Sequence, residues 1–462
     1  MLLINNNKVI DMKASENLRL SGIHYVMFVS YSLTFLIWGF VTTSGVMSIY
    51  YFSKYIPRFL VPISVALGPI SLMIGNVFMG RLADIVGRRG GIYAYTMSLY
   101  TIGLIGMGLS ILLSNVIPAS EAFIPFIISY ILAEIGVGGE EPPALAAATE
   151  LMPYNYRGGS MLVLITNFDN IGAAIASAIL LLALMRGTQL SATWTMIGSA
   201  IIVLIVAVII RLITPESVRW LVVKGRVSEA ERIANEYGLS YTLTEGPRQS
   251  IRFPPLWFRT LVLSLLGISQ LVTYGLMAFY IVYLPSLPFS SNEMLATQVL
   301  LWANVGASIA GLIGLVIDRL SRKVFTLISF LGGLLTMIPI FMIYGVMSGS
   351  SLASSLVVFY VLLFLNMVFS EFGWAVRVLL EPELYPTRNR ATWVGVVRFV
   401  AWVMYVLLIY YLLASANTYV YLLSNLILYV VGFLAALAWF IFGVETRGGL
   451  PVHALDKAAD GR

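Results

Sequence analysis

The sequence predicts an all-α integral membrane protein with twelve transmembrane helices in two six-helix halves. Hydrophobic residues make up 59% of the 462 residues, charged residues make up only 11%, and the mean hydropathy is +0.90. A soluble protein of this length needs far more charged surface. Apolar runs of roughly 20 residues, the length of a helix that crosses about 30 Å of hydrocarbon, recur about twelve times. Short charged motifs also occur twice in the same order, which predicts the two halves.

The apolar runs predict helices rather than barrel strands, because they are long and continuous and every backbone polar group in lipid needs an internal partner. The first run is too long and starts too late in the chain to be a cleaved signal peptide. The expected spans are 25–48, 59–79, 92–115, 122–149, 160–183, 193–213, 260–285, 297–317, 324–346, 354–380, 392–413 and 420–442.

Basic residues are distributed unevenly between the two sides of the predicted membrane. Only Lys54, Arg58 and Arg186 fall in the loops of one side, whereas most others lie in the terminal segments and the even-numbered connections. The positive-inside rule therefore predicts that both termini are cytoplasmic and that the protein lies in the cell membrane. The pI near 9.3 reflects this asymmetry and does not indicate a nucleic-acid partner. The chain has no cysteine and no metal-ligand spacing, so we expect neither a metal nor a cofactor.

Three charged motifs recur at nearly one offset along the chain. The pairs are "GRLADIVGRR" at 80–89 with "GLVIDRLSRK" at 314–323, "ELMPYNYR" at 150–157 with "ELYPTRNR" at 383–390, and "PES" at 215–217 with "VET" at 444–446. Their offsets are 234, 233 and 229 residues. The repeat predicts an N-terminal half at 1–213, a cytoplasmic linker at 214–259 and a C-terminal half at 260–462. Within the linker, Ser228 and Glu231 form a capping box and Gly238 a stop signal, which predicts a short helix.

These motifs resemble those of a known family of transporters. "GRLADIVGRRG" resembles the loop between helices 2 and 3 of the major facilitator superfamily, and "PESVRWLVVKGRVSEA" resembles the sugar-porter sequence P-E-S-P-R-W-L. "VETRG" resembles the P-E-T-K-G after helix 12, with Val444 in place of proline. Glu383 to Thr387 match the E-L-Y-P-T of the organic-ion and metabolite–proton branches. The resemblance covers almost the whole chain and implies the major facilitator fold.

The repeated motifs place acids among bases on the predicted cytoplasmic face of both halves. Opposite charges at helix ends attract, and helix termini add partial charge of either sign. The resemblance implies a gate that holds the cytoplasmic ends together while the other side is open; the alternative is that some of these residues only set topology. The predicted gate residues are Gly80, Asp84, Arg88, Arg89, Glu150, Arg157, Glu216, Arg219, Asp318, Arg322, Glu383, Arg390 and Glu445.

Ionisable residues inside the spans are more informative, because each is costly if it faces lipid. A helix rise of about 1.5 Å per residue places Glu140 about 15 Å and Asp169 about 18 Å from the cytoplasmic motifs of their spans, near the midplane. Glu140 and Glu141 are about 100° apart around the helix, so they cannot both face one point. Pro142 and Pro143 deprive two carbonyls of the preceding turn of their helical partners.

We predict that Glu140, Glu141 or Asp169 carries a coupling proton. The phosphate–proton branch has an acid at the position of Glu140, so the resemblance favours Glu140. The alternative is a carboxylate that is hydrogen-bonded within its half and never titrates. Symporters of the family commonly hold an aspartate in helix 1, where this chain has Val41. A proton carrier must therefore lie on another helix, or the protein is a uniporter.

Arg398 is the one base expected at membrane depth, about 12 Å from Arg390. The organic-anion branch has an arginine in this helix that meets anionic cargo, so the resemblance implies a substrate-binding role. The alternative is a structural salt bridge to Glu371, itself a candidate for the site, while Arg377 is expected nearer the surface and paired with Glu381. The other residues predicted to line the site are Gln270, Tyr274, Asn167 and Trp374, with simple helix packing as the alternative for each.

Together these observations predict a secondary transporter and not an enzyme, because the chain has no paired catalytic motif and no nucleotide-binding loop. We expect a monomer in the lipid bilayer that moves a small polar metabolite by alternating access, with proton symport of an organic acid as the first prediction. Sugar transport or uniport, drug or metabolite efflux, and a non-transporting nutrient sensor are the alternatives. Gln270 stands without the second glutamine and the G-x-N that sugar porters carry in helix 7, which disfavours a hexose.

Overall fold

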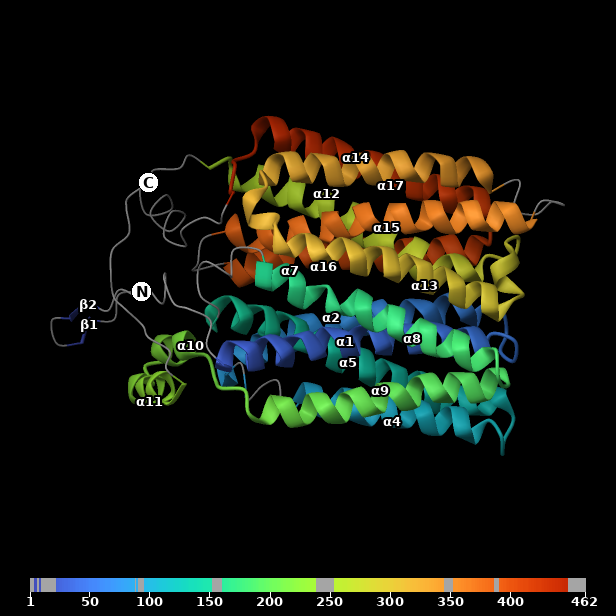
Figure 1. The fold of residues 1–462 in the computed structure, drawn as a ribbon, viewed down its shortest axis with the longest axis horizontal. Helices are drawn as coiled ribbons and strands as arrows, with labels where there is room; N and C mark the ends of the chain where they lie inside the picture. The colour runs from blue at the N-terminus through green and yellow to red at the C-terminus, as the bar shows by residue number, and fades with distance from the viewer. Residues whose placement is uncertain are drawn as a thin grey trace.

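The protein is a bundle of long apolar helices that run side by side (Figure 1). The computed structural model describes residues 4–5, 8–9, 22–87, 89, 95–151, 160–237, 253–344, 352–385 and 390–447. In this part of the chain, eleven helices are long and apolar enough to cross a membrane, and a twelfth, shorter apolar helix spans Met97–Leu113. The predicted twelve spans are therefore confirmed, each within a few residues. Within the described ranges, the strands are one antiparallel pair, β1 (Ile4–Asn5) and β2 (Lys8–Val9).

The helices follow the predicted order. The first six spans are α1 (Gly22–Phe52), α2 (Leu60–Val86), α4 (Met97–Leu113), α5 (Ala119–Leu151), α7 (Ser160–Thr166) with α8 (Phe168–Leu184), and α9 (Gln189–Leu212). The last six spans are formed by α12 (Leu256–Gly275), α13 (Glu293–Ala310), α14 (Arg322–Ile343), α15 (Leu352–Glu383), α16 (Arg390–Ser415) and α17 (Thr418–Phe442). Between the two sets lie α10 (Val218–Val223) and α11 (Val227–Tyr237). The short helix expected before Gly238 is thus present, as α11.

The two sets of helices occupy different sides of the bundle, blue to green below and yellow to red above in Figure 1. In the first set, α2 and α4 pack on α5, and α1 packs on α8; in the second, α13 and α14 pack on α15, and α12 and α14 pack on α17. Contacts between the sets run mainly through α8 with α13 and α2 with α16. The residue boundaries of the halves stay a prediction. We call the end of the bundle that carries α10 and α11 the α11 end, and the other the opposite end.

Three spans depart from regular α-helix. The fifth is interrupted by a turn at Asn167, between α7 and α8. The seventh continues from α12 as a π-helix, η2 (Leu276–Tyr280), and a 3-10 turn, η3 (Ile281–Tyr283). The eighth ends in a 3-10 segment, η5 (Gly311–Leu315). Irregular backbone at membrane depth is tolerated where protein buries it, and π-bulges are frequent at functional sites. Two further 3-10 turns are η4 (Pro288–Ser290) and η6 (Ile317–Arg319).

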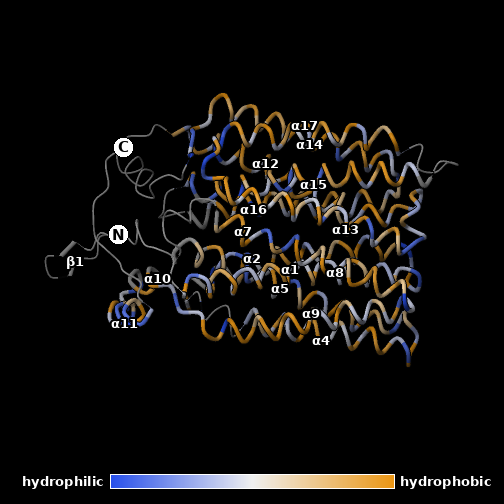
Figure 2. The backbone as a smooth tube through the Cα atoms, viewed as in Figure 1, coloured by the Kyte–Doolittle hydropathy of each residue, from blue (hydrophilic) through white to orange (hydrophobic). Residues whose placement is uncertain are grey.

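The side chains on the flanks of the bundle are apolar. Ile202, Ile205 and Ile209 of α9 are all more than half exposed, and hydrophobic residues continue along the length of the helices in Figure 2. An apolar surface of this extent is unfavourable in water and suits hydrocarbon. The protein is therefore an integral membrane protein whose helices bury their polar side chains inward.

Glycine lets two helices approach each other beside one of the predicted site residues. A Cβ at Gly39 of α1 would overlap the carbonyl oxygen of Asp169, and a Cβ at Gly172 of α8 would overlap the backbone of Leu36. Small residues at such crossings allow backbones to pack closely in membranes. This crossing fixes the start of α8, and with it Asp169, against α1.

Candidate functional site

Glu140 and Glu141 lie on a helix that the two following prolines do not interrupt. α5 runs without a break from Ala119 to Leu151 through Pro142 and Pro143. Both carboxylates are buried, with Glu140 1% and Glu141 2% exposed. Because successive residues point about 100° apart, the two side chains find different partners. The sequence predicted this divergence, and the structure identifies the partner of each.

Glu140 is paired inside the first set of helices. Its Oε1 forms an ion pair with the Arg211 guanidinium of α9 and accepts a hydrogen bond from the Thr34 hydroxyl of α1 at 3.0 Å. Arg211 also donates to Thr34 Oγ1 at 2.7 Å and to Ser30 Oγ at 3.2 Å, and its guanidinium lies 5.0 Å from the centre of the Tyr31 ring. These contacts tie α1, α5 and α9 together. A buried pair with this many hydrogen bonds is costly to break on one side only.

Glu141 is paired across the two sets of helices. Its Oε1 accepts a hydrogen bond from Arg398 Nη1 of α16 at 2.5 Å. Arg398 Nε in turn donates to Glu381 Oε2 of α15 at 2.8 Å. The sequence offered a salt bridge between Arg398 and Glu371 as an alternative, and that expectation was wrong. Arg398 reaches the first set of helices instead, which no motif in the sequence indicates.

The network continues into the second set of helices. Arg377 donates to Glu381 Oε1 at 2.9 Å and to Gln270 Oε1 of α12 at 2.7 Å. The Trp374 ring centre lies 5.3 Å from the Arg377 guanidinium and 5.7 Å from that of Arg398, a cation–π arrangement on both. The predicted pairing of Arg377 with Glu381 is confirmed. Arg377 is also buried in the bundle, at 2% exposed, whereas the expected membrane depth of Arg398 and Arg377 stays a prediction.

Asp169 and Glu371 meet at the interface without an arginine. Asp169 lies in the first turn of α8, where its Oδ1 accepts the Asn170 backbone N–H at 2.5 Å. Asn170 Nδ2 donates to Glu371 Oε2 of α15 at 2.9 Å, and the two carboxyl groups are electrostatic neighbours. Glu371 Oε1 has no hydrogen-bond partner in the described part of the protein. A buried acid, Glu371, and a partly buried acid, Asp169, are therefore electrostatic neighbours across the halves.

Tyr274 and Asn167 complete this side of the interface. The Tyr274 hydroxyl of α12 is hydrogen-bonded to Asn170 Oδ1 at 2.9 Å and to Asn304 Oδ1 at 2.8 Å. Asn167, at the break between α7 and α8, donates to the Ser308 carbonyl of α13 at 2.9 Å. The structure thus brings the predicted residues Asn167, Tyr274 and Glu371 to one region with Asp169. Half-helix ends near the midplane are typical binding sites in secondary transporters.

The buried charges divide into two classes. Three arginines in the interior (Arg211, Arg377 and Arg398) are paired with three carboxylates (Glu140, Glu141 and Glu381). Two further buried acids, Glu134 and Glu371, and the partly buried Asp169 form no ion pair within the described ranges. An isolated carboxylate in low dielectric is strongly disfavoured in its charged form. The acids without a cation are therefore the better proton-binding groups.

The predicted gate motifs lie at the α11 end, and the two halves use them in the same way. Glu216 Oε2 accepts the Arg89 backbone N–H at 3.0 Å, and Glu445 Oε2 accepts the N–H of Lys323, the residue that corresponds to Arg89, at 3.5 Å. Glu445 Oε1 also accepts the Arg322 backbone N–H at 2.8 Å. Arg322 also pairs with Asp318 at 3.0 Å. The predicted repeat thus joins "PES" to the first loop motif and "VET" to its counterpart. In each half, the glutamate of the later motif therefore accepts a backbone N–H at the end of the loop motif.

The remaining predicted gate residues lie on several different elements. Glu383 is partly buried near Arg322 and Thr446. Gly80 and Asp84 lie on α2, Glu150 near the end of α5, Arg219 on α10 and Arg390 at the start of α16. Arg88 and Arg157 lie outside the described residues. The gate role of the set stays a prediction.

Glu445 shows the electrostatic effect of a helix N-terminus outside the membrane. Partial burial of its carboxyl opposes ionisation, but the Ser321 hydroxyl and the backbone N–H groups of Arg322 and Lys323 donate to it, and together they lower its pKa below the usual value. These groups form the first turn of α14, where the helix dipole also favours an anion.

Sequence reasoning missed Arg211 and Asn170. Arg211 stands one residue before the end of α9, so it resembled a loop cation that only sets topology, whereas its long side chain points into the bundle and is 2% exposed. Asn170 follows Asp169 and carried no motif. Within the described ranges no group of three or more His, Cys, Asp or Glu residues could hold a metal ion.

Comparisons with known proteins agree with this architecture. The family model described as sugar (and other) transporter matches residues 53–450. The inner membrane metabolite transport protein YdjE of Escherichia coli is 24% identical over 94% of this chain and 95% of its own, and the niacin transporter NiaP of Acinetobacter baylyi is 24% identical over 83% and 85%. The solved proton:xylose symporter XylE superimposes with a TM-score of 0.73 at 17% identity, over 94% of this chain and 98% of that one. The expected major facilitator fold is thereby confirmed.

Proposed function

The chain belongs to the sugar (and other) transporter family, and on this basis we propose that it is a proton-coupled secondary transporter of small organic acids. The expected membership of the major facilitator superfamily is confirmed, and its family and structural neighbours are transporters rather than enzymes. It is an integral membrane transporter of the sugar or metabolite type. We propose four further properties: the cargo class, the coupling ion, the cytoplasmic position of the α11 end and the monomeric state.

The observation that carries the proposal is the Arg398 guanidinium between the two halves. It contacts Glu141 of one half and Glu381 of the other, and Glu381 keeps Arg377 as a second partner. A cargo carboxylate that replaces Glu141 at Arg398 gains a charge-assisted hydrogen bond and frees the halves from each other at this point. Binding of an anion is thereby linked to separation of the halves, which alternating access requires.

The relatives support an acidic cargo in part. NiaP is named as a niacin transporter, and niacin is a small aromatic carboxylate. Sugar transport is the second candidate, favoured by the plastidic glucose transporter of Arabidopsis thaliana, which is 26% identical over 70% of this chain and 61% of its own. Gln270, which was predicted to line the site, already accepts a hydrogen bond from Arg377. That contact favours the organic acid.

The proton has a separate candidate. Of the predicted carriers, Glu140 is paired with Arg211 and Glu141 with Arg398, whereas Asp169 forms no ion pair within the described ranges. Asp169 also lies at a break between two half-helices and beside Glu371 of the other half. Two like charges in one buried site favour binding of a shared proton. These contacts favour Asp169 as the proton-coupling residue.

The test is uptake into proteoliposomes of a panel of labelled carboxylates and sugars, with and without an imposed pH gradient. We expect gradient-driven accumulation of a carboxylate. Arg398→Ala should reduce carboxylate binding about 10- to 100-fold, the loss of one hydrogen bond to a charged group, and should change neutral cargo little. Asp169→Asn should abolish accumulation but retain exchange. Accumulation of sugars alone, or equal loss of both cargo classes in Arg398→Ala, would contradict the proposal.

A further inference from the structure

Glu134 is a third carboxylate of α5, and the transport site described above does not use it. Its side chain is 0% exposed. Oε1 accepts a hydrogen bond from the Thr42 hydroxyl of α1 at 3.3 Å, and the Tyr130 hydroxyl, one helical turn away, is its other hydrogen-bonding neighbour. Oε2 has no partner in the described part of the protein. Arg211, Arg377 and Arg398 are each paired with another carboxylate, and the buried Arg259 donates to the Leu384 carbonyl.

Such surroundings suit a neutral carboxylic acid better than a carboxylate. An anion in a buried site needs a cation or several donors, and Glu134 has two hydroxyl neighbours and an open oxygen. A protonated carboxyl carries no net charge and itself becomes a donor, so the cost of burial falls sharply. Glu134 therefore differs from Glu140, six residues further along α5, whose charge is balanced by Arg211.

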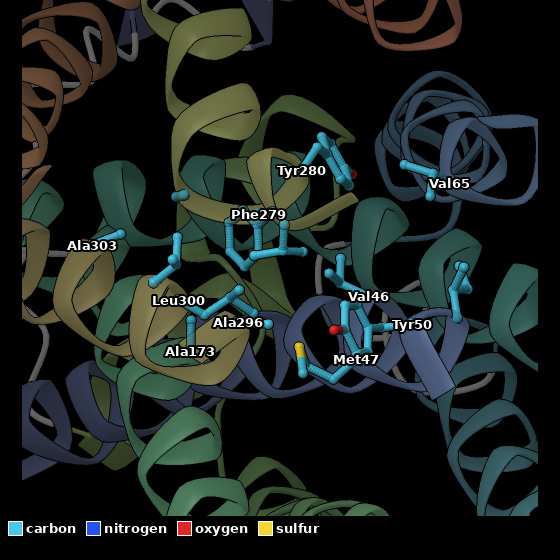
Figure 3. Close-up of a cluster of buried hydrophobic side chains, with 14 of the residues drawn as sticks. Val46, Met47, Tyr50, Val65, Ala173, Phe279, Tyr280, Ala296, Leu300 and Ala303 are labelled. Atoms are coloured by element: carbon cyan, nitrogen blue, oxygen red, sulfur yellow. The ribbon is translucent and has the colours of Figure 1, made fainter. Parts of the chain in front are cut away.

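Glu134 lies near two hydrogen bonds between the halves at the opposite end: its donor Thr42 stands one helical turn before Val46 on α1. The Tyr283 hydroxyl donates to the Val46 carbonyl at 2.5 Å, and the Tyr50 hydroxyl donates to the Phe289 carbonyl at 2.7 Å. We call these four residues the tyrosine seam, because both hydrogen bonds join α1 to the second half of the chain. Figure 3 shows Val46 and Tyr50 in one apolar cluster with Phe279 and Tyr280. The seam and this cluster shield the interior at this end from water.

Among the described residues, the other titratable neighbours of Glu134 and of Tyr130 beside it are tyrosines. Tyr280 of the second half is its electrostatic neighbour, and Tyr283 and Tyr280 are neighbours of Tyr130. α4 contributes Tyr100, which packs at Gly136, and α2 contributes Gly68 opposite the Tyr130 hydroxyl. None of these groups is a cation at neutral pH. The charge state of Glu134 is consequently set by its access to water.

From this geometry we infer that Glu134 is a proton-binding gate residue for the opposite end. It holds its proton while the tyrosine seam is closed and releases it to water when the seam opens, with the O–H bond broken and the proton accepted by water. High pH at this end therefore favours the open seam. The inference rests on the proposed function only in that the two ends open in turn.

The experiment measures opening of the seam directly with a cysteine reporter. The chain has no cysteine, so Ser48→Cys, buried on α1 between Val46 and Tyr50, supplies a single thiol. An impermeant maleimide is added on the side of the membrane that the opposite end faces, and the labelling rate is measured from about pH 6 to about pH 9. Each rate is divided by the labelling rate of the unfolded protein at the same pH, which removes the effect of thiol ionisation. We expect the normalised rate to rise about tenfold across this range in the wild-type background, and less than about twofold with Glu134→Gln.

Two variants serve as controls in the same assay. Glu134→Asp retains an acid and should keep the pH dependence, whereas Glu121→Gln removes an exposed acid from the first turn of α5 and should change nothing. Equal pH dependence in the wild-type background and in Glu134→Gln, or none in the wild-type background, would overturn the inference. Asp169→Asn separates the two proposals, because it should lose proton-driven accumulation and keep pH-dependent labelling. Uptake that ignores the pH gradient would defeat only the proposed coupling.

Discussion

Glu140 and Glu141 are neighbours in the chain, but their ion pairs have different consequences. The Glu140–Arg211 pair lies within one half and is surrounded by hydroxyl groups of α1. The Glu141–Arg398 pair joins the halves and borders residues of the proposed site. A rigid half needs the first pair in every conformation, whereas the halves can separate only if the second pair breaks. One residue of helical rotation thus separates an ion pair within a half from one that, under the proposed mechanism, breaks during transport.

The largest effect is expected from Arg211→Ala. It leaves Glu140 buried with a single hydroxyl donor, Thr34, and removing one partner of a buried pair costs about 3–5 kcal/mol. The detergent-solubilised variant should unfold at a markedly lower temperature or denaturant concentration. The double variant Arg211→Ala, Glu140→Gln should recover much of the loss, because no isolated charge remains. A loss below about 1 kcal/mol in the single variant would show that Glu140 does not depend on Arg211.

How far the sequence could anticipate this arrangement depends on the range of the interaction. Apolar run length fixed the spans, and the i, i+4 spacing of Arg377 and Glu381 predicted their pairing, because both are local properties. Arg398 lies 257 residues from Glu141, and only the packing of α16 beside the first half brings them together. The chain has Val41 where the resemblance implies an acid in symporters, so the sequence predicted either a proton carrier on another helix or a uniporter. Choosing among the buried acids required knowing which of them an arginine neutralises.

An intermediate effect is expected from Glu141→Gln, and it should appear in conformation rather than in folding. Arg398 retains Glu381, so the free energy of unfolding should fall by only about 1–2 kcal/mol. Without the pair across the halves, the α11 end should open more often. Leu164 of α7 packs against Gly314 of the other half and can carry a reporter cysteine. Labelling of Leu164→Cys should become about tenfold faster in Glu141→Gln, from the loss of about 1.4 kcal/mol of closure.

Glu140→Gln is the matched control for that measurement, since it neutralises the adjacent residue of the same helix. Its labelling rate should stay within about twofold of the parent, because the Glu140 pair lies within one half. Equal acceleration by both substitutions would remove the distinction between the two pairs.

The smallest effect is expected at Glu445, which is exposed to solvent, unlike the buried Glu140 and Glu141. Its folded pKa is depressed by donors at the start of α14, so its contribution to stability is present above the unfolded pKa and is lost as pH falls through the folded pKa. Solvent screening limits that contribution to about 0.5–1 kcal/mol. The stability difference between the parent and Glu445→Gln, measured by denaturant titration, should thus be constant above about pH 5 and vanish under more acidic conditions. Glu229→Gln, which removes an exposed ion pair with Arg226, should show a smaller difference. If the stability difference between the parent and Glu445→Gln persists in acid, the hydrogen bonds of Glu445 stabilise the fold without its charge. Burial would then not explain why Glu445 contributes less than Glu140.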